Sequence, residues 1–142
     1  MEVTGVATVD NVISGNYIGL YSGLVIMGNA GSGVSIQNAA DTIVGGDAPG
    51  KGNVISANAR GIQISGATAT NTLIYGNYIG TDPTGLVDYG NANEGIRLQN
   101  SAGNNEIGGG RAGPGHGNFR HHRGGVAGGL GRGRPAVGHR VH

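Results

Sequence analysis

The chain has 142 residues, of which 32 are glycine, while only 12% are charged and 4% aromatic. This length suits one domain, and so much glycine with so few helix-forming residues excludes a mainly helical protein. The absence of cysteine excludes disulfides and thiolate metal sites.

Charge divides the chain into two parts. Residues 1–109 carry three basic and eight acidic residues, a net charge of −5, whereas residues 110–142 carry six arginines, all five histidines and no acid. Such an asymmetry predicts two regions with different roles, 1–109 and 110–142. The N-terminus lacks the basic start and apolar run of a signal peptide, and no segment has the ~20 apolar residues that span a membrane.

Residues 11–109 contain repeated segments. NVISGNYIG (11–19) resembles NVISAN (53–58), and GNYIG recurs unchanged at 76–80. A second family is GVSIQNA (33–39), GIQISGA (61–67) and GIRLQNS (95–101), and a third is DTIVGG (41–46), NTLIYGN (71–77) and NNEIGG (104–109). Equivalent positions lie 28 and then 34 residues apart in the second family (33, 61, 95), and 30 and then 33 apart in the third (42, 72, 105). Repeats at this period indicate a solenoid.

Each repeated segment predicts a strand of about four residues, because apolar and polar residues alternate in it. The alternation predicts six core residues: Val34, Ile36, Ile62, Ile64, Ile96 and Leu98. Glycine and asparagine between the strands favour turns. Strands begin about 8–11 residues apart, which is too close for βαβ crossovers. Whole motifs recur, which a sandwich does not require, so we expect a parallel coil of short strands.

The segments GNVISAN, GIQISGA, NTLIYGNYIGTDPTGLVDYGN, GIRLQN and NNEIGG resemble bacterial right-handed parallel β-helix repeat proteins of the pectate-lyase-like superfamily. The resemblance covers about residues 11–109. It implies an all-β fold over residues 1–109, a short right-handed parallel β-helix of about three to four coils, in a secreted or cell-surface protein. The chain then reads as a fragment of a longer protein.

Two functions are compatible with this resemblance, because the superfamily includes lyases, hydrolases and adhesins. The favoured one is a non-catalytic structural or glycan-contacting module with polysaccharide as its partner. The alternative is a fragment of a polysaccharide lyase or glycoside hydrolase that acts on acidic polysaccharide.

A polar face is predicted on the outside of the coil. Three outward positions of the second repeat family align into one row and the next three into another: Ser35, Gln63 and Arg97, then Gln37, Ser65 and Gln99. Such rows can hydrogen-bond glycan hydroxyls, or they form an ordinary solvated face. Four tyrosines can add stacking surfaces for sugars: Tyr17, Tyr75, Tyr78 and Tyr89.

The acids are scattered, and no pair stands two residues apart at matching positions. Asp82 and Asp88 lie in the longest predicted inter-strand loop, residues 81–94. We interpret them as turn formers, with a Ca²⁺ site or a catalytic role as the alternative. No cofactor is otherwise predicted.

The repeat pattern fails after residue 109. This glycine- and arginine-rich tail is expected to be disordered, because it has little apolar surface to offset the entropy of ordering. An alternative is an out-of-frame reading: PGHGN (114–118) matches PGKGN (49–53), but FRHHR then replaces VISAN.

The paired His121 and His122 lack a nearby carboxylate for a metal site. Arginine- and glycine-rich segments can bind nucleic acid through phosphate contacts and base stacking, without sequence specificity. We therefore expect no specific nucleic-acid partner. With no cap beyond the last coil, its exposed strand edge favours self-association.

Overall fold

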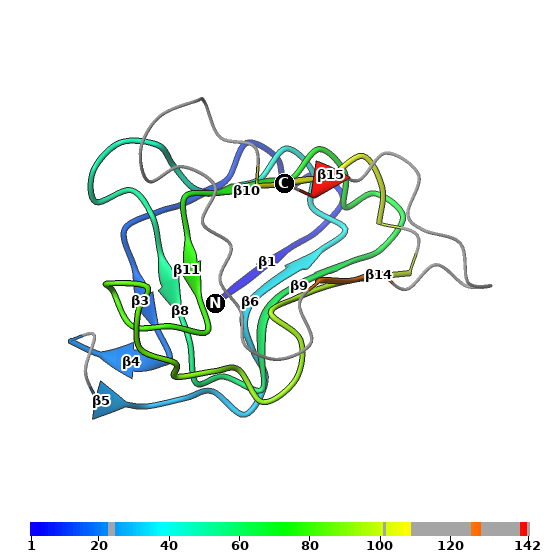
Figure 1. The fold of residues 1–142 in the computed structure, drawn as a ribbon. Helices are drawn as coiled ribbons and strands as arrows, with labels where there is room; N and C mark the ends of the chain where they lie inside the picture. The colour runs from blue at the N-terminus through cyan, green and yellow to red at the C-terminus, as the bar shows by residue number, and fades with distance from the viewer. Residues whose placement is uncertain (23–24, 101, 109–125, 129–139, 142) are drawn as a thin grey trace.

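The structure is a computed structural model that describes residues 1–22, 25–100, 102–108, 126–128 and 140–141. Within these residues it is all-β, with no helix, and its three main sheets are parallel. The sheets form the walls of a solenoid of about three turns (Figure 1). The predicted fold class is thereby confirmed.

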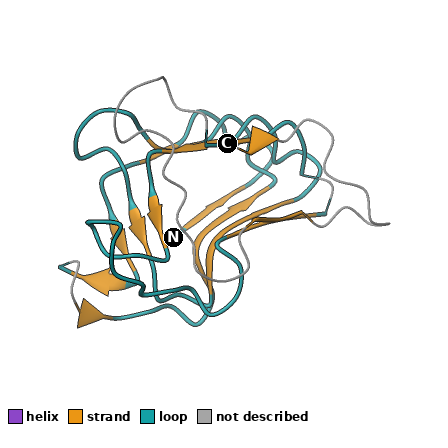
Figure 2. Ribbon diagram, viewed as in Figure 1, coloured by secondary structure: helices purple, strands orange, loops and turns teal. Residues whose placement is uncertain are grey.

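Each of the first three turns contributes one short strand to each wall, and the later strands extend only sheets A and B (Figure 2). Sheet A contains β1 (Glu2–Thr4), β6 (Ser32–Gln37), β9 (Arg60–Ser65), β12 (Ile96–Gln99) and β14 (Val126–Gly128). Sheet B contains β2 (Val12–Ile13), β7 (Ile43–Gly45), β10 (Leu73–Tyr75), β13 (Glu106–Ile107) and β15 (Arg140–Val141). Sheet C contains β3 (Tyr17–Ile18), β8 (Val54–Ile55) and β11 (Tyr78–Ile79).

The strands pair in the register that the sequence repeats predict. In sheet A, Val34 pairs with Ile62, and Ile62 with Ile96, which reproduces the spacings of 28 and 34 residues. In sheet B, Ile43 pairs with Leu73, and Leu73 with Glu106, which reproduces 30 and 33. Repeated residues therefore stack directly on one another from turn to turn.

The core consists of apolar rows that run along the solenoid axis. All six predicted core residues are buried, with at most 3% of their surface exposed. Sheets B and C add two further rows, Ile13–Val44–Ile74–Ile107 and Ile18–Ile55–Ile79. The alternation of each strand turns every second side chain inward, so the narrow interior fills with β-branched residues.

Two ladders of asparagines, buried except at their N-terminal members Asn16 and Asn29, fix the corners on either side of sheet C. In the first, the Asn16 backbone N–H and Nδ2 both donate to Asn53 Oδ1 at 3.0 Å, and Asn53 donates likewise to Asn77 Oδ1 at 3.0 and 2.9 Å. In the second, Asn58 occupies the place of Asn53, between Asn29 and Asn91. Each amide satisfies backbone groups that the turn would otherwise leave buried without partners.

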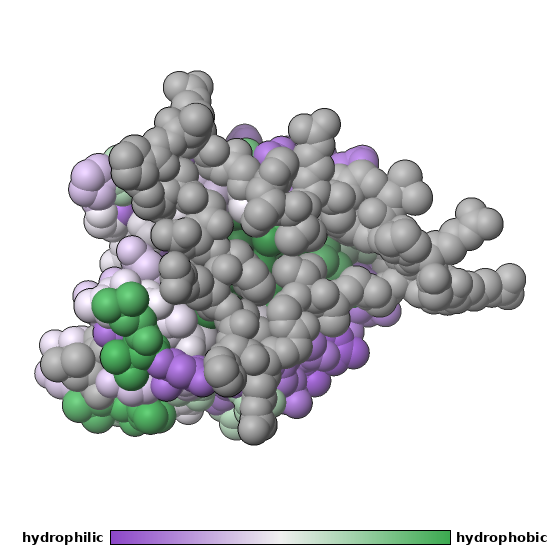
Figure 3. Space-filling view, viewed as in Figure 1, coloured by the Kyte–Doolittle hydropathy of each residue, from purple (hydrophilic) through white to green (hydrophobic). Residues whose placement is uncertain are grey.

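One antiparallel hairpin interrupts the parallel pattern, and the sequence did not indicate it. β4 (Leu20–Tyr21) pairs with β5 (Val25–Ile26) between the first and second turns. Val25 and Ile26 are more than half exposed, and Figure 3 shows apolar surface around β5. The pairing arises because both segments have β-forming residues and lie close in sequence, which suffices for a hairpin.

Two segments of the predicted tail are described. β14 continues sheet A beside β12, and β15 continues sheet B beside β13, both in parallel. The remaining tail residues, 110–125, 129–139 and 142, lie outside the described residues. The prediction of disorder or of an out-of-frame reading was made for all of residues 110–142, of which these two strands are the described part. His121 and His122 lie outside the described residues.

Candidate functional site

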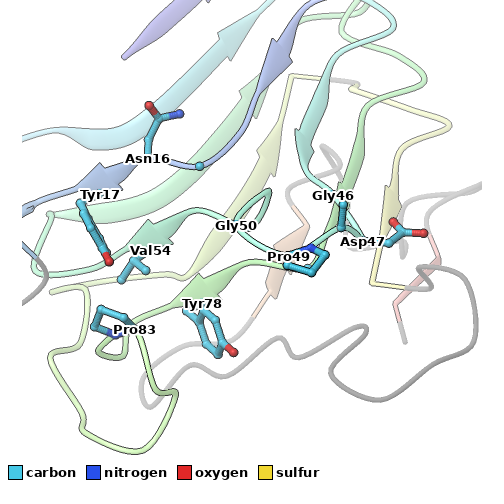
Figure 4. A pocket seen from close by; sticks show the side chains of 13 residues that line it. Asn16, Tyr17, Gly46, Asp47, Pro49, Gly50, Val54, Tyr78 and Pro83 are labelled. Atoms are coloured by element: carbon cyan, nitrogen blue, oxygen red, sulfur yellow. The ribbon is translucent and has the colours of Figure 1, made fainter.

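A groove of about 540 Å³ runs over the outer surface of sheet C (Figure 4). Its floor is one outward-facing row of paired residues, Tyr17 in β3, Val54 in β8 and Tyr78 in β11. Val54 is 5% exposed, whereas Tyr17 is 53% exposed. A small residue between two aromatic ones leaves a hollow in the row, with a ring on either side.

The loop between β7 and β8 forms one wall of the groove. Asp47, Pro49 and Gly50 lie on this loop and line the groove (Figure 4). The loop closes on itself where the Lys51 N–H donates to the Ala48 carbonyl at 3.0 Å. It is tied to the turn below by the Gly15 N–H, which donates to the Lys51 carbonyl at 3.0 Å.

Close approach of the backbone sets the shape of this wall. A Cβ atom on Gly52 would lie 2.0 Å from the Gly76 carbonyl oxygen of the next turn. No side chain is compatible with that distance, so glycine is required where the loop re-enters β8. The glycine content of the sequence thereby contributes directly to the groove.

The loop after β11 contributes Pro83 to the groove. An antiparallel bridge between Thr81 and Asp88 closes this loop, so it forms a short hairpin-like projection. Pro83 lies near Val54 in Figure 4, at the opposite end of the groove from Asp47.

Asp82 organises the turn that carries Pro83. Its carboxylate accepts hydrogen bonds from the Thr84 hydroxyl at 2.7 and 2.8 Å, and from the N–H groups of Leu86 and Val87, both at 3.1 Å. Asp82 is 6% exposed, and its burial acts to raise its pKa. The hydrogen bonds from Thr84, Val87 and Leu86 outweigh the burial and hold the pKa of Asp82 below the usual value of 3.8.

Asp88 is also engaged within the same loop, because its Oδ1 accepts the Gly90 N–H at 2.9 Å. The structure therefore places both predicted loop acids in turn-forming roles, which is the interpretation favoured from sequence. Within the described residues, no three acidic or histidine side chains gather in a way that could hold a metal ion. The Ca²⁺ alternative remains a prediction without added support.

Asp82→Asn is expected to destabilise the protein at neutral pH, because a neutral amide cannot accept all of these hydrogen bonds. The carboxylate has a lowered pKa in the folded state, so its contribution is complete above 3.8 and disappears as the pH falls through the lower folded value. Urea unfolding of both proteins, from neutral pH down to about pH 2, measures the difference.

The expected result is a stability difference that narrows below pH 3.8, the usual pKa. Asp10→Asn is the matched control, since Asp10 lies in an exposed turn with a positive φ of 57° that asparagine also adopts. A difference for Asp82→Asn that is independent of pH would contradict this role of the carboxylate.

The predicted polar rows lie on the outside of sheet A in the expected register. Ser35 pairs with Gln63 and Gln63 with Arg97, while the second row joins Gln37, Ser65 and Gln99. Figure 3 shows hydrophilic surface along this side of the molecule.

Several polar groups of these rows are satisfied by neighbouring protein atoms. Arg97 Nη1 lies 3.8 Å from Glu94 Oε1, and the same carboxylate lies 3.1 Å from Arg60 Nε. The Gln37 amide donates to the Ser35 hydroxyl at 3.3 Å, and Ser65 is 8% exposed. Several side chains of the rows are thus bonded to neighbouring protein atoms, whereas the groove lies over sheet C.

The four tyrosines named from sequence separate into different places. Tyr17 and Tyr78 flank the sheet C groove, whereas Tyr75 lies on sheet B. Tyr89 lines a second groove of about 690 Å³ at the corner after sheet C, together with Ala57, Asn58 and Ala59.

Sequence reasoning missed the contribution of Asp47, Pro49 and Pro83, because loops far apart in the chain bring them together. The identical GNYIG segments were the available signal, since they place two tyrosines on one row.

Comparisons of the chain with protein-family models, with curated proteins and with solved structures found no match. No helix among the described residues is long and apolar enough to cross a membrane. The class of the protein is therefore defined by its structure, as a parallel β-solenoid of about three turns. A groove that contains Tyr17 and Tyr78 lies over the outside of sheet C.

Proposed function

We propose that this chain is a non-catalytic β-solenoid module that binds polysaccharide in the groove over sheet C. The observation that carries the proposal is the row Tyr17–Val54–Tyr78 at the base of a groove of about 540 Å³. Tyrosine rings offer an apolar face to the C–H face of a sugar and a hydroxyl to its polar edge. A concave site with aromatic walls and a few polar groups is typical of small-molecule and glycan recognition.

The charge of the groove favours binding over catalysis. Glycoside hydrolysis by the usual route needs two carboxyl groups that flank the bond to be cleaved. Asp47 is the one carboxylate among the described residues that line the groove, and the Asp82 carboxylate is engaged in its own turn. We therefore place the lyase or hydrolase function second, with no residue of the described part assigned to it.

The setting of the module is part of the same proposal. The repeated segments resemble bacterial β-helix proteins of the pectate-lyase-like superfamily, and that resemblance supports a secreted or cell-surface location. A solenoid contacts its ligand along one face while each turn is held by its neighbours, which suits a repeating polymer as partner. Self-association through a coil edge remains a separate expectation.

Tyr78→Ala is expected to weaken polysaccharide binding about tenfold, which corresponds to about 1.4 kcal/mol. Affinity electrophoresis against a panel of soluble plant and microbial polysaccharides measures the effect. Tyr75→Ala is the matched control, because Tyr75 has the same side chain but lies on sheet B outside the groove.

A second pair of variants separates the groove from the polar rows of sheet A. Gln63→Ala should leave binding unchanged if the groove is the site. Loss of binding in Gln63→Ala but not in Tyr78→Ala would move the site to sheet A. A release of unsaturated or reducing sugars by the wild-type protein that Asp47→Asn abolishes would contradict a non-catalytic role.

A further inference from the structure

The row of residues at the base of the groove has two large side chains with a small one between them. Tyr17, Val54 and Tyr78 occupy paired positions on β3, β8 and β11, so their side chains all leave sheet C on its outer face. Neighbouring strands lie about 4.8 Å apart, which places the backbones of the two tyrosines about 10 Å apart. The space above Val54, between Tyr17 and Tyr78, is called the gap below (Figure 4).

The size of the gap suits one ring of a ligand. Val54 is 5% exposed and still lines the groove, so it forms the bottom of the gap. A ring placed above Val54, midway between the tyrosines, would lie about 5 Å from each, a separation at which the faces of two rings attract each other. A pyranose ring carries C–H groups on both faces, so it can contact one tyrosine on each side.

Pro83 closes one end of the gap. It lines the same groove and lies near Val54 (Figure 4). The turn that carries Pro83 is held by hydrogen bonds from one hydroxyl and two backbone N–H groups to the buried Asp82 carboxylate, which fix the proline in place. In the opposite direction the groove continues to Gly50, where a Cβ atom would meet no atom of the described residues within 4 Å.

We infer that the gap holds the terminal sugar of a polysaccharide chain, with Tyr17 and Tyr78 stacked on its two faces. The inference rests on the proposed function of the groove and adds which part of the glycan is recognised. Val54 lies under one edge of such a ring, and Pro83 borders a second edge. A sugar inside a chain such as cellulose carries its two linkages at opposite edges, and each pair of opposite edges here has one that is covered. A terminal sugar carries a single linkage, which leaves the gap toward Gly50.

The number of chain ends is the variable that tests this inference. A polysaccharide bound by the full chain is partly hydrolysed, its terminal sugars are counted, and the fragments compete with the intact polymer for the protein. Potency per unit mass should rise in proportion to the number of terminal sugars. A potency that stays constant or falls would show that internal sugars are bound, and would overturn the inference while the proposed function stood. An absence of binding to any polysaccharide, or binding that Tyr78→Ala leaves unchanged, would overturn both.

Val54→Tyr distinguishes stacking on both faces of one ring from a flat aromatic platform. Its side chain would occupy the gap, so binding should fall at least about tenfold. The variant should be as stable as the wild type in urea, because tyrosine suits a strand and its ring would pack between the two others. Val54→Thr is the control, since its branched side chain leaves the gap open and should keep binding within about twofold. Binding by Val54→Tyr that is equal to or tighter than that of the wild type would mean a platform and overturn the inference.

A disaccharide from the bound polysaccharide tests whether both tyrosines contact the same sugar. Tyr17→Ala and Tyr78→Ala should weaken its binding alike in calorimetric titrations, because each variant removes the contact with one face of one ring. A loss that is confined to one of the two variants would contradict stacking on both faces.

Pro83→Ala tests the closed end of the gap. Removal of the proline ring should open this end, so the variant should bind the intact polymer better, relative to the fragments, than the wild type does. Leu86→Ala is the matched control, because Leu86 lies on the same loop, is 80% exposed and does not line the groove. A preference for fragments that Pro83→Ala leaves unchanged would contradict the role of Pro83 as the end wall.

Discussion

Asn53→Ala is expected to lower the free energy of unfolding by about 3–5 kcal/mol, because several buried hydrogen bonds depend on this one side chain. Asn53 Oδ1 accepts from the backbone and side chain of Asn16, and Asn53 Nδ2 donates to the carbonyl of Ile13 at 2.9 Å and to Asn77 Oδ1 at 2.9 Å. Asn53 is completely buried, so water cannot replace the lost partners. Alanine would leave an N–H and a carbonyl without partners at the corner of two turns.

Chemical denaturation monitored by circular dichroism measures this effect. Asn93→Ala is the matched control, because Asn93 is exposed and its side chain donates to a backbone carbonyl, that of Ala59. We expect it to cost less than about 1 kcal/mol. Similar losses for the two variants would show that the ladder contributes no more than an exposed amide.

Ile62→Ala is expected to cost about 2–5 kcal/mol, since it removes a fully buried side chain from the centre of the sheet A row. Ile62 packs between Val34 of the preceding turn and Ile96 of the following one. The backbone on both sides is held by parallel pairing, which limits how far the row can collapse into the cavity. Ile62→Val removes one methylene group and should cost about 0.5–1.5 kcal/mol.

The neighbouring residue provides the control for this variant. Gln63 is adjacent in sequence and in the same strand, but it points outward, so Gln63→Ala should change stability by no more than about 0.5 kcal/mol. Thermal or urea unfolding of the three variants gives the comparison. A loss for Gln63→Ala as large as that for Ile62→Ala would contradict the assignment of inner and outer faces.

The fold was predictable because repetition made the register visible. The spacings of GVSIQNA, GIQISGA and GIRLQNS translate directly into the pairing of β6, β9 and β12, and alternation identified Ile62 and Ile64 as core. The hairpin of β4 and β5 was not predicted, although the antiparallel bridge between Thr81 and Asp88 follows the second GNYIG segment as this hairpin follows the first. Its signal is local, two short β-forming runs around a turn, and resembles many segments that do not pair.

The candidate site was less predictable than the fold. The two GNYIG segments placed Tyr17 and Tyr78 on equivalent turns, but nothing in the sequence joined them to Asp47 or Pro83. Those residues come from loops whose course depends on backbone contacts such as that of Gly52 with Gly76. The rows of sheet A were predicted in register, yet the engagement of Arg97 by Glu94 depends on a loop residue outside the repeat.

The asparagine ladders have a consequence for how this protein can be altered. Asn16 and Asn53 are separated by 37 residues and Asn53 and Asn77 by 24, yet both pairs bond with the same geometry at 3.0 Å. The closing contact of a turn is thus independent of how much chain lies in the connecting loops. Loop length costs little in closure entropy. New segments grafted between β3 and β6, or between Thr81 and Asp88, should therefore be accepted without a shift of the strands. The solenoid is in this sense a scaffold whose connecting loops can be replaced one at a time.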